Sequence, residues 1–190
     1  MAKTLGKALV LWSGGAASTW ALVQMLRTET AAVYAHHHIR KIPGQRAAQP
    51  AHECRLAAVR RMRQTLAESG ADFAYSESFA DHSGFPVMAR DTVSALFHGA
   101  QAALSWGFRP GDALIFGTAP DRAADSSAAL AEEMRFLSVL HRYVTQAVFL
   151  NDAIPRILWL EPPRTDAALM TELPEKIRED VIRPLQAVPD

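Results

Sequence analysis

The residues best suited to chemistry form one short stretch near the start of the chain, SGGAAST at Ser13–Thr19. Its two glycines separate an apolar run from a helix-like pattern, and glycine lets backbone N–H groups approach an anion closely. The first turn of a helix adds unpaired N–H groups and the positive end of the helix dipole. With the hydroxyls of Ser13, Ser18 and Thr19 as further donors, the stretch predicts a cradle for phosphate or pyrophosphate.

Two other phosphate-binding loops do not fit this stretch. The Walker loop requires Gly-x-x-x-x-Gly-Lys-Ser/Thr, and no lysine lies between Ala8 and Leu22. The dinucleotide fingerprint requires Gly-x-Gly-x-x-Gly, which is also missing. The alternative is a tight turn from strand to helix in which a serine caps the helix. The position after the first strand of an α/β pattern favours phosphate.

The stretch resembles the SGGxDS loop of the PP-loop ATP pyrophosphatases, in the adenine nucleotide alpha-hydrolase-like group. The residues that match are Ser13, Gly14, Gly15 and Ser18. The resemblance implies that the loop, together with Ala16 and Thr19, binds the pyrophosphate part of ATP. It also implies that a substrate oxygen attacks the α phosphate, which forms an adenylated intermediate and releases pyrophosphate.

Ala17 stands where that family has aspartate. In ATP chemistry such a carboxylate typically holds Mg²⁺ or its water shell. The resemblance therefore places Ala17 at a catalytic position and implies Mg²⁺ as a cofactor beside ATP. The alanine is either a natural degeneration or an engineered inactivation. We expect this loop to bind a nucleotide more readily than to cleave one.

Shorter stretches resemble the 7-cyano-7-deazaguanine synthase branch of that family, which makes a queuosine precursor. They are Gly44-Gln45-Arg46 with Glu53, Pro120-Asp121-Arg122, and Leu160-Glu161-Pro162-Pro163 with Thr165. The resemblance implies a deazapurine-type substrate, bound by Arg46, Glu53 and Asp121. Arg122 is the second catalytic candidate, because a guanidinium there would neutralise phosphate charge. The alternative for Arg122 is an ion pair at the start of a helix.

The cysteine content separates this chain from that branch, which holds zinc with four cysteines near its C-terminus. Here Cys54 is the only cysteine, so a tetrahedral thiolate zinc site is excluded and no metal-ligating residue is assigned. A single cysteine also cannot form an intrachain disulfide. This composition favours a reducing, cytoplasmic setting.

The size and charge of the chain limit its partners. Its 190 residues are 49% apolar and carry a formal net charge of zero. This predicts one domain over 1–190 with a sizeable core, and it argues against a broad electrostatic grip on nucleic acid or anionic lipid. No apolar run approaches the length of a membrane span. The expected partners are a nucleotide and a small-molecule substrate.

His36-His37-His38 is the other conspicuous group. On a strand alternate residues share a face, so we expect His36 and His38 to point together into the ligand crevice and His37 to point away. The favoured interpretation is that an imidazole stacks on or hydrogen-bonds a nucleotide. A metal site that also uses His52 and Cys54 is the alternative. Glu77 and Ser78, which follow the third apolar run, are candidate substrate contacts or a surface turn.

The elements that must position these residues follow from hydrophobic periodicity. Strands are expected at Ala8–Trp12, Ala31–His37, Asp72–Glu77, Ala113–Gly117 and Arg156–Leu160. Helices are expected at Ala16–Arg27, Ala51–Ser69, Asp91–Trp106, Asp125–Phe149, Asp166–Met170 and Pro174–Val181. Ile39–Pro50 is expected to be a loop. The apolar stripe of Ala129–Phe149 is either core or the face of a homodimer.

This alternation predicts a three-layer α/β sandwich with a mostly parallel five-stranded sheet. The fold would be Rossmann-like and, by the resemblance, of the HUP type, with 164–190 as a short helical extension. Ligands in such sheets bind beyond the carboxyl ends of the strands, which adds Gly117 to the nucleotide-binding candidates.

The predicted function is ATP binding with adenylation of a carbonyl or carboxylate on a small molecule or base. Pyrophosphate would be released, and the activated group would pass to a nitrogen nucleophile. Two alternatives stay open. One is a nucleotide-binding sensor or partner subunit without turnover, which Ala17 favours. The other is a nucleotide hydrolase.

Overall fold

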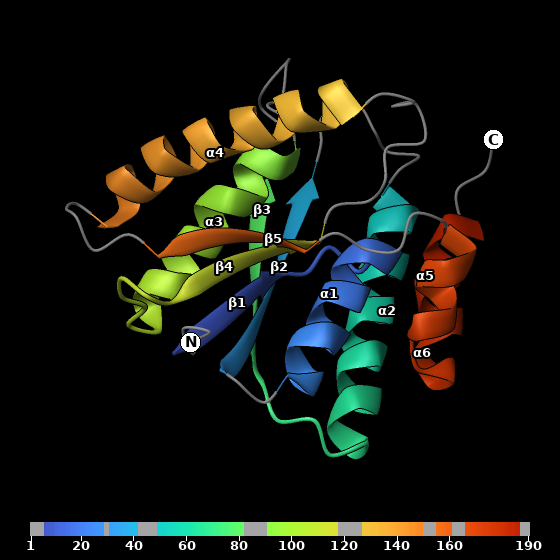
Figure 1. Cartoon of the computed structure of the whole chain (residues 1–190). Coiled ribbons are helices and arrows are strands. Elements are labelled where there is room, and N and C mark those ends of the chain that lie inside the picture. Colours follow the sequence, from blue (N-terminus) through green and yellow to red (C-terminus); the bar gives the residue numbers. More distant parts are fainter. Residues whose placement is uncertain are drawn as a thin grey trace.

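The computed structural model describes residues 6–28, 31–41, 49–81, 91–117, 127–149, 155–160 and 166–186. The strands are β1 (Lys7–Leu11), β2 (Ala32–Lys41), β3 (Ala74–Asp81), β4 (Ala113–Gly117) and β5 (Arg156–Leu160). All of their pairings are parallel, and they form one sheet in the order β3-β2-β1-β4-β5 (Figure 1). The chain reverses direction across the sheet between β1 and β4.

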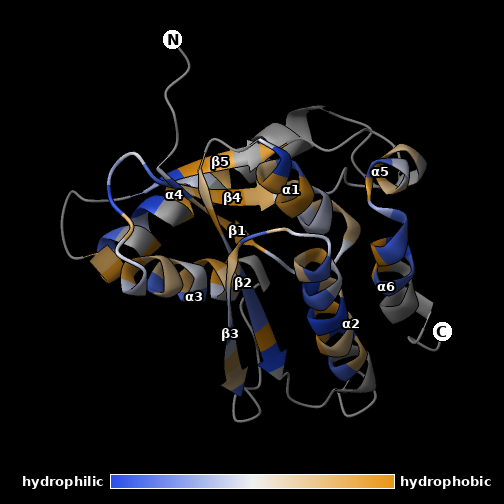
Figure 2. Cartoon of the chain, turned by 90° about the horizontal axis from the view of Figure 1, so that it is seen from below, coloured by the Kyte–Doolittle hydropathy of each residue, from blue (hydrophilic) through white to orange (hydrophobic). Residues whose placement is uncertain are grey.

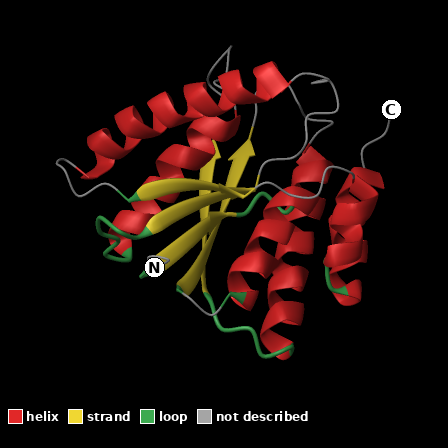
Figure 3. Ribbon diagram, viewed as in Figure 1, coloured by secondary structure: helices red, strands yellow, loops and turns green. Residues whose placement is uncertain are grey.

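The helices are α1 (Ala16–Arg27), α2 (Gln49–Glu68), α3 (Asp91–Ser105), α4 (Ser127–Phe149), α5 (Asp166–Glu172) and α6 (Glu175–Gln186). Helices α1 and α2 cover one face of the sheet, while α3 and α4 cover the other (Figures 1 and 3). The predicted three-layer, Rossmann-like α/β fold with a parallel five-stranded sheet is therefore confirmed. Among the described helices, none has both the length and the apolar character that a bilayer span requires.

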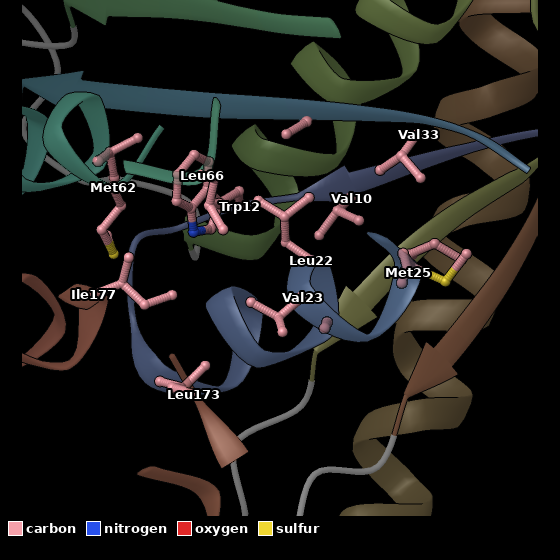
Figure 4. Packing of buried hydrophobic residues seen from close by; sticks show 14 of the residues in the cluster. Val10, Trp12, Leu22, Val23, Met25, Val33, Met62, Leu66, Leu173 and Ile177 are labelled. Carbon is pink, nitrogen blue, oxygen red and sulfur yellow. The ribbon is translucent and has the colours of Figure 1, made fainter. Parts of the chain in front are cut away.

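The core is divided by the sheet into two layers, because side chains alternate along each strand. On the α1 and α2 side, Val10 and Trp12 pack with Leu22 and Val33 (Figure 4). On the α3 side, Leu9 of β1 packs in a second cluster, which also contains Leu11, Leu96, Leu114 and Phe116. Strand β1 is thus buried on both faces, which explains its uninterrupted apolar sequence.

The C-terminal helices join the first of these cores. Leu173, Ile177 and Val181 are buried in the same cluster as α1 and α2. Arg61 of α2 donates to Asp180 of α6 at 2.7 Å. The segment 166–186 therefore completes the apolar face of α2, which would otherwise lie open.

Strands β2 and β3 extend further than expected. Residues 39–41, predicted to be a loop, continue β2 and pair with residues 79–81 of β3. Figure 2 shows the hydrophilic colour of β2 near its carboxyl end, in contrast with β1 and β4. The expectation was wrong because the extension is held by backbone ladder bonds, which leave no apolar pattern in the sequence. The remaining loop residues, 42–48, lie outside the described part.

The described side chains of helix α4 are exposed or half-buried. Leu140 and Val144 are half-buried against the second core. Phe136, Val139 and Tyr143 are exposed, and Tyr143 retains 71% of its accessible surface. Of the methionine and leucine residues in the stripe that the sequence placed in the core or at a dimer face, Leu140 is the one whose side chain is described, and it packs against the second core.

Candidate functional site

A pocket of about 220 Å³ lies at the carboxyl edge of the sheet, beside the point where the strand order reverses. Its polar lining consists of Ser13, Ser18, His36, His37, His38, Arg40 and Arg55. Leu11, Trp12, Ile39, Ala95, Phe116 and Gly117 complete it. The location agrees with the rule for open α/β sheets.

The loop between β1 and α1 is held by its own serines. Ser18 Oγ donates to the Gly15 carbonyl at 3.1 Å, so Ser13 Oγ must be the donor in the 2.9 Å contact between the two hydroxyls. Ser18 Oγ also accepts the Ser13 backbone N–H at 3.1 Å. Both hydroxyl protons are thus used within the loop. At Gly15 no side chain caps α1, so the first-turn N–H groups of Ala16, Ala17 and Ser18 are the donors left for a ligand.

Three glycines at this edge have different tasks. Gly14 has a φ of +81°, and a Cβ there would lie 2.6 Å from a methyl of Val59 on α2. A Cβ on Gly117 would lie 2.7 Å from the Ala17 carbonyl carbon. These two glycines therefore allow α2 and β4 to approach the loop. A Cβ on Gly15 would lie no closer than 3.5 Å to another group, Ser13 Oγ, so the backbone at Gly15 has open space beside it.

Three predicted loop residues have side chains outside the pocket lining. Thr19 is fully buried, and its hydroxyl accepts the Trp12 indole N–H at 2.9 Å. Ala17 is buried and does not line the pocket, although its backbone N–H belongs to the open first turn. Ala16 packs against the core on the α1 side. From these residues only backbone groups are offered to a ligand.

His36 and His38 point to the same side of β2, as predicted, and belong to one hydrogen-bond chain. His36 Nδ1 contacts Ser76 Oγ at 2.7 Å and its Nε2 contacts Ser78 Oγ at 2.9 Å. His38 Nδ1 contacts the same Ser78 Oγ at 2.8 Å, and its Nε2 contacts Ser94 Oγ on α3 at 2.7 Å. All four ring nitrogens therefore have hydroxyl partners.

Both of these imidazoles are held neutral. Burial, followed by the charges of His98 and His37, lowers the pKa of His36 to about 4. Burial and the neighbouring His98, which stacks on the ring at 4.2 Å between centroids, lower the pKa of His38 to about 3. The pair therefore forms an uncharged part of the pocket wall at neutral pH.

We expect this pair to make the fold acid-sensitive. The folded-state pKa values of His36 and His38 lie below the ordinary 6.5, so the unfolded chain binds protons first. The free energy of unfolding should be highest above pH 6.5 and should fall by about 1–2 kcal/mol per pH unit between pH 6 and 5. This range allows for the partial exposure of His38, which weakens its contribution. Urea unfolding at pH 7.5, 6.5, 5.5 and 5.0 measures this. A constant free energy of unfolding across that range would contradict it.

Three other predicted site residues are described, and all three lie outside the pocket lining. Glu77 accepts from Arg60 at 2.6 Å and from the Tyr75 hydroxyl at 2.8 Å. The Arg60 hydrogen bond, despite partial burial, holds the pKa of Glu77 below its ordinary value. Glu53 is exposed on α2. The third, Ser78, joins His36 and His38. Arg46, Asp121 and Arg122 lie outside the described residues.

Two charged pocket residues were missed by sequence reasoning, and both are arginines. Arg40 lies in the part of β2 that was expected to be loop. Arg55 precedes Val59, Met62 and Leu66 at helical spacing on the buried side of α2. A charged residue one helical turn before an apolar stripe lies on the same face of the helix, and this pattern could have identified Arg55 from the sequence. Arg55 forms no hydrogen bond or ion pair with another described residue.

His37 was expected to point away, and its side chain does leave on the other side of β2. It nevertheless lines the pocket, because the pocket wraps around the carboxyl end of the strand. Its Nδ1 lies 2.7 Å from the Trp12 carbonyl oxygen. The structure thus adds His37 to the candidate site.

A protein-held metal centre finds no support within the described residues, where no three His, Cys, Asp or Glu side chains gather in a metal-binding group. The described pocket lining also contains no carboxylate. What the pocket does offer is two guanidinium groups and an uncapped helix N-terminus, which together suit an anion.

Models of known protein families were compared with the chain and none matches. A search of curated proteins gives no match either. Functional inference for this chain therefore depends on the pocket and on the motif in its first loop.

Proposed function

We propose that the chain binds ATP in this pocket and adenylates a carbonyl or carboxylate on a small molecule or base, with release of pyrophosphate. The activated group would then pass to a nitrogen nucleophile. The observation that carries the proposal is the convergence of the open first turn of α1 with Arg55 and Arg40 in one pocket. A pyrophosphate group is the common biological ligand with matching charge and size.

Each part of the pocket has a task in this proposal. The N–H groups of Ala16 and Ala17 would hold phosphate oxygens, and Arg55 would neutralise their charge from the α2 side. Ser13 and Ser18 would keep the loop in its shape through their mutual hydrogen bonds. The rate of reaction would come from holding the reactants together and from donors that are already oriented.

The resemblance to the SGGxDS loop supports the type of reaction, but the residues do not suit a protein-held Mg²⁺. The position of the family aspartate is Ala17, and the described lining offers no other carboxylate. A metal ion arriving with ATP would have to be held by the phosphates themselves. No step of the proposed reaction is assigned to it.

A nucleotide-binding sensor or partner subunit is the second candidate. The same observation at Ala17 favours it, because binding needs the backbone donors and the arginines, whereas metal-assisted turnover needs the missing carboxylate. In this case the nucleotide would bind without being consumed.

The deciding experiment combines binding and turnover. Calorimetric titration with ATP, AMP and pyrophosphate tests the pocket, and absence of binding for all three would refute the proposal. The protein and its Ala17→Asp variant are then incubated with ATP and Mg²⁺, and AMP, ADP and pyrophosphate are followed.

Release of AMP and pyrophosphate by Ala17→Asp alone would indicate a ligase-type site that lacks its carboxylate. Binding without turnover in either form would support the sensor, and ADP would indicate a hydrolase. Ala16→Asp is the matched control, since it adds the same charge one residue away on the same turn of α1.

A further inference from the structure

His37 differs from its two neighbours in the state of its ring. Its Nδ1 lies 2.7 Å from the Trp12 carbonyl oxygen, which can only accept a hydrogen bond. Nδ1 must therefore carry the proton, and in the neutral ring Nε2 is left with a lone pair. The Trp12 carbonyl thus fixes both the tautomer and the orientation of this imidazole.

The lone pair on Nε2 belongs to a side chain of the pocket lining. His37 lines the pocket, and within the described residues its Nε2 makes no hydrogen bond. In His36 and His38, by contrast, both ring nitrogens contact serine hydroxyls. Of the three pocket imidazoles, His37 alone can offer a free base to a ligand.

The charges around His37 keep this base available. Arg55 and Arg60 of α2 and Glu77 of β3 are the charged groups that act on it. Burial is the largest influence and, with the two arginines, it lowers the pKa of His37, while the Trp12 hydrogen bond and Glu77 act in the opposite direction. The unprotonated form therefore prevails at neutral pH, which is the form that a general base requires.

We propose that His37 is the general base of this pocket and accepts a proton from the nucleophile through Nε2. The identity of the nucleophile rests on the proposed function. The nitrogen lone pair forms the new bond to the activated carbon, and the bond from that carbon to the AMP oxygen breaks with its electron pair. The proton lost by the nitrogen moves to Nε2. The Trp12 carbonyl stabilises the resulting imidazolium through Nδ1–H, and the proton then passes to solvent.

The first test requires no knowledge of substrate. Diethyl pyrocarbonate acylates imidazole nitrogens that have a free lone pair, and peptide mass spectrometry locates the product. In the folded protein we expect His37 to react well before His36 and His38, and we expect pyrophosphate or AMP to slow this reaction. The protein unfolded in guanidinium chloride is the control, in which these histidines should react alike. Faster reaction at His36 or His38 than at His37 would overturn the proposal.

The second test separates a base from a phosphate-binding cation. His37→Asn keeps an N–H near Nδ1 for the Trp12 carbonyl and removes Nε2. Titration with pyrophosphate at pH 7 in two buffers of different ionisation enthalpy counts the protons taken up. If His37 is a base, His37→Asn should bind pyrophosphate within about threefold of the original affinity, a difference below about 0.7 kcal/mol. Proton uptake on binding should be negligible in both proteins.

The proposal would be overturned if the original protein takes up a proton on binding, while His37→Asn takes up none and binds pyrophosphate at least tenfold more weakly. That result would show that His37 binds phosphate as an imidazolium cation. If neither form binds ATP, AMP or pyrophosphate, the proposed function fails. The order of acylation still decides in that case whether His37 carries the open base.

Discussion

Replacing Arg55 by methionine is expected to weaken pyrophosphate binding about ten- to a hundredfold. The Arg55 stem lies beside the loop, with its Cγ 3.4 Å from where a Cβ on Gly14 would stand, and the residue lines the pocket. A charge-assisted hydrogen bond contributes about 1.5–3 kcal/mol, and methionine keeps the aliphatic packing while it removes this bond. Calorimetric titration with pyrophosphate measures the change.

Arg63→Met is the matched control for this prediction. Arg63 lies on the same helix, but it is exposed and its guanidinium lies over the Tyr75 ring at 4.9 Å. Its loss removes the same charge from α2 without touching the pocket lining. Equal affinities in the two variants would mean that Arg55 does not contact the anion and that the pyrophosphate site lies elsewhere.

Gly117→Ala is expected to destabilise the fold by about 1–3 kcal/mol, the usual cost of overpacking. The added methyl would lie 2.7 Å from the Ala17 carbonyl carbon and 3.0 Å from Ser18 Cα. These are backbone atoms of α1, which cannot turn aside as a flexible side chain would. Thermal unfolding should show a melting temperature lower by roughly 2–4 °C for each kcal/mol.

Gly15→Ala should give the opposite pattern. Its methyl would meet only Ser13 Oγ, at an ordinary contact distance of 3.5 Å, so we expect a stability change below about 1 kcal/mol. The same methyl would occupy the open approach to the first turn of α1 and weaken pyrophosphate binding.

If Gly117→Ala proved as stable as the original protein, the close approach of β4 to α1 would be wrong.

The parts of the fold that sequence reasoning predicted well have sharp chemical boundaries. Helix Ala16–Arg27 and strands Ala113–Gly117 and Arg156–Leu160 agree with the structure at both ends. Each begins or ends close to glycine or proline, and the two strands are compact apolar runs. The ends of β2 and β3 were missed because their polar side chains resemble a loop, whereas the ladder bonds that hold them come from the backbone.

The candidate site was only partly accessible from sequence. The first loop could be found because glycines after a first strand have a recognisable purpose. Arg55 was not singled out, since only the packing of α2 against the loop reveals that it lines the pocket. His37 was placed away from the ligand by strand alternation. That rule is correct for the sheet, but it does not describe a pocket that wraps around the end of a strand.

The chain of imidazoles and hydroxyls has one more consequence, which concerns the alignment of two strands. The outer parts of β2 and β3 lack the apolar alternation that normally sets register. His36 stands opposite Ser76 and His38 opposite Ser78, and the three hydrogen bonds between these side chains depend on that alignment. A slip by one residue would turn the serines to the opposite face and break them together. His36 and His38, which line the pocket, thus also fix the register of β2 and β3.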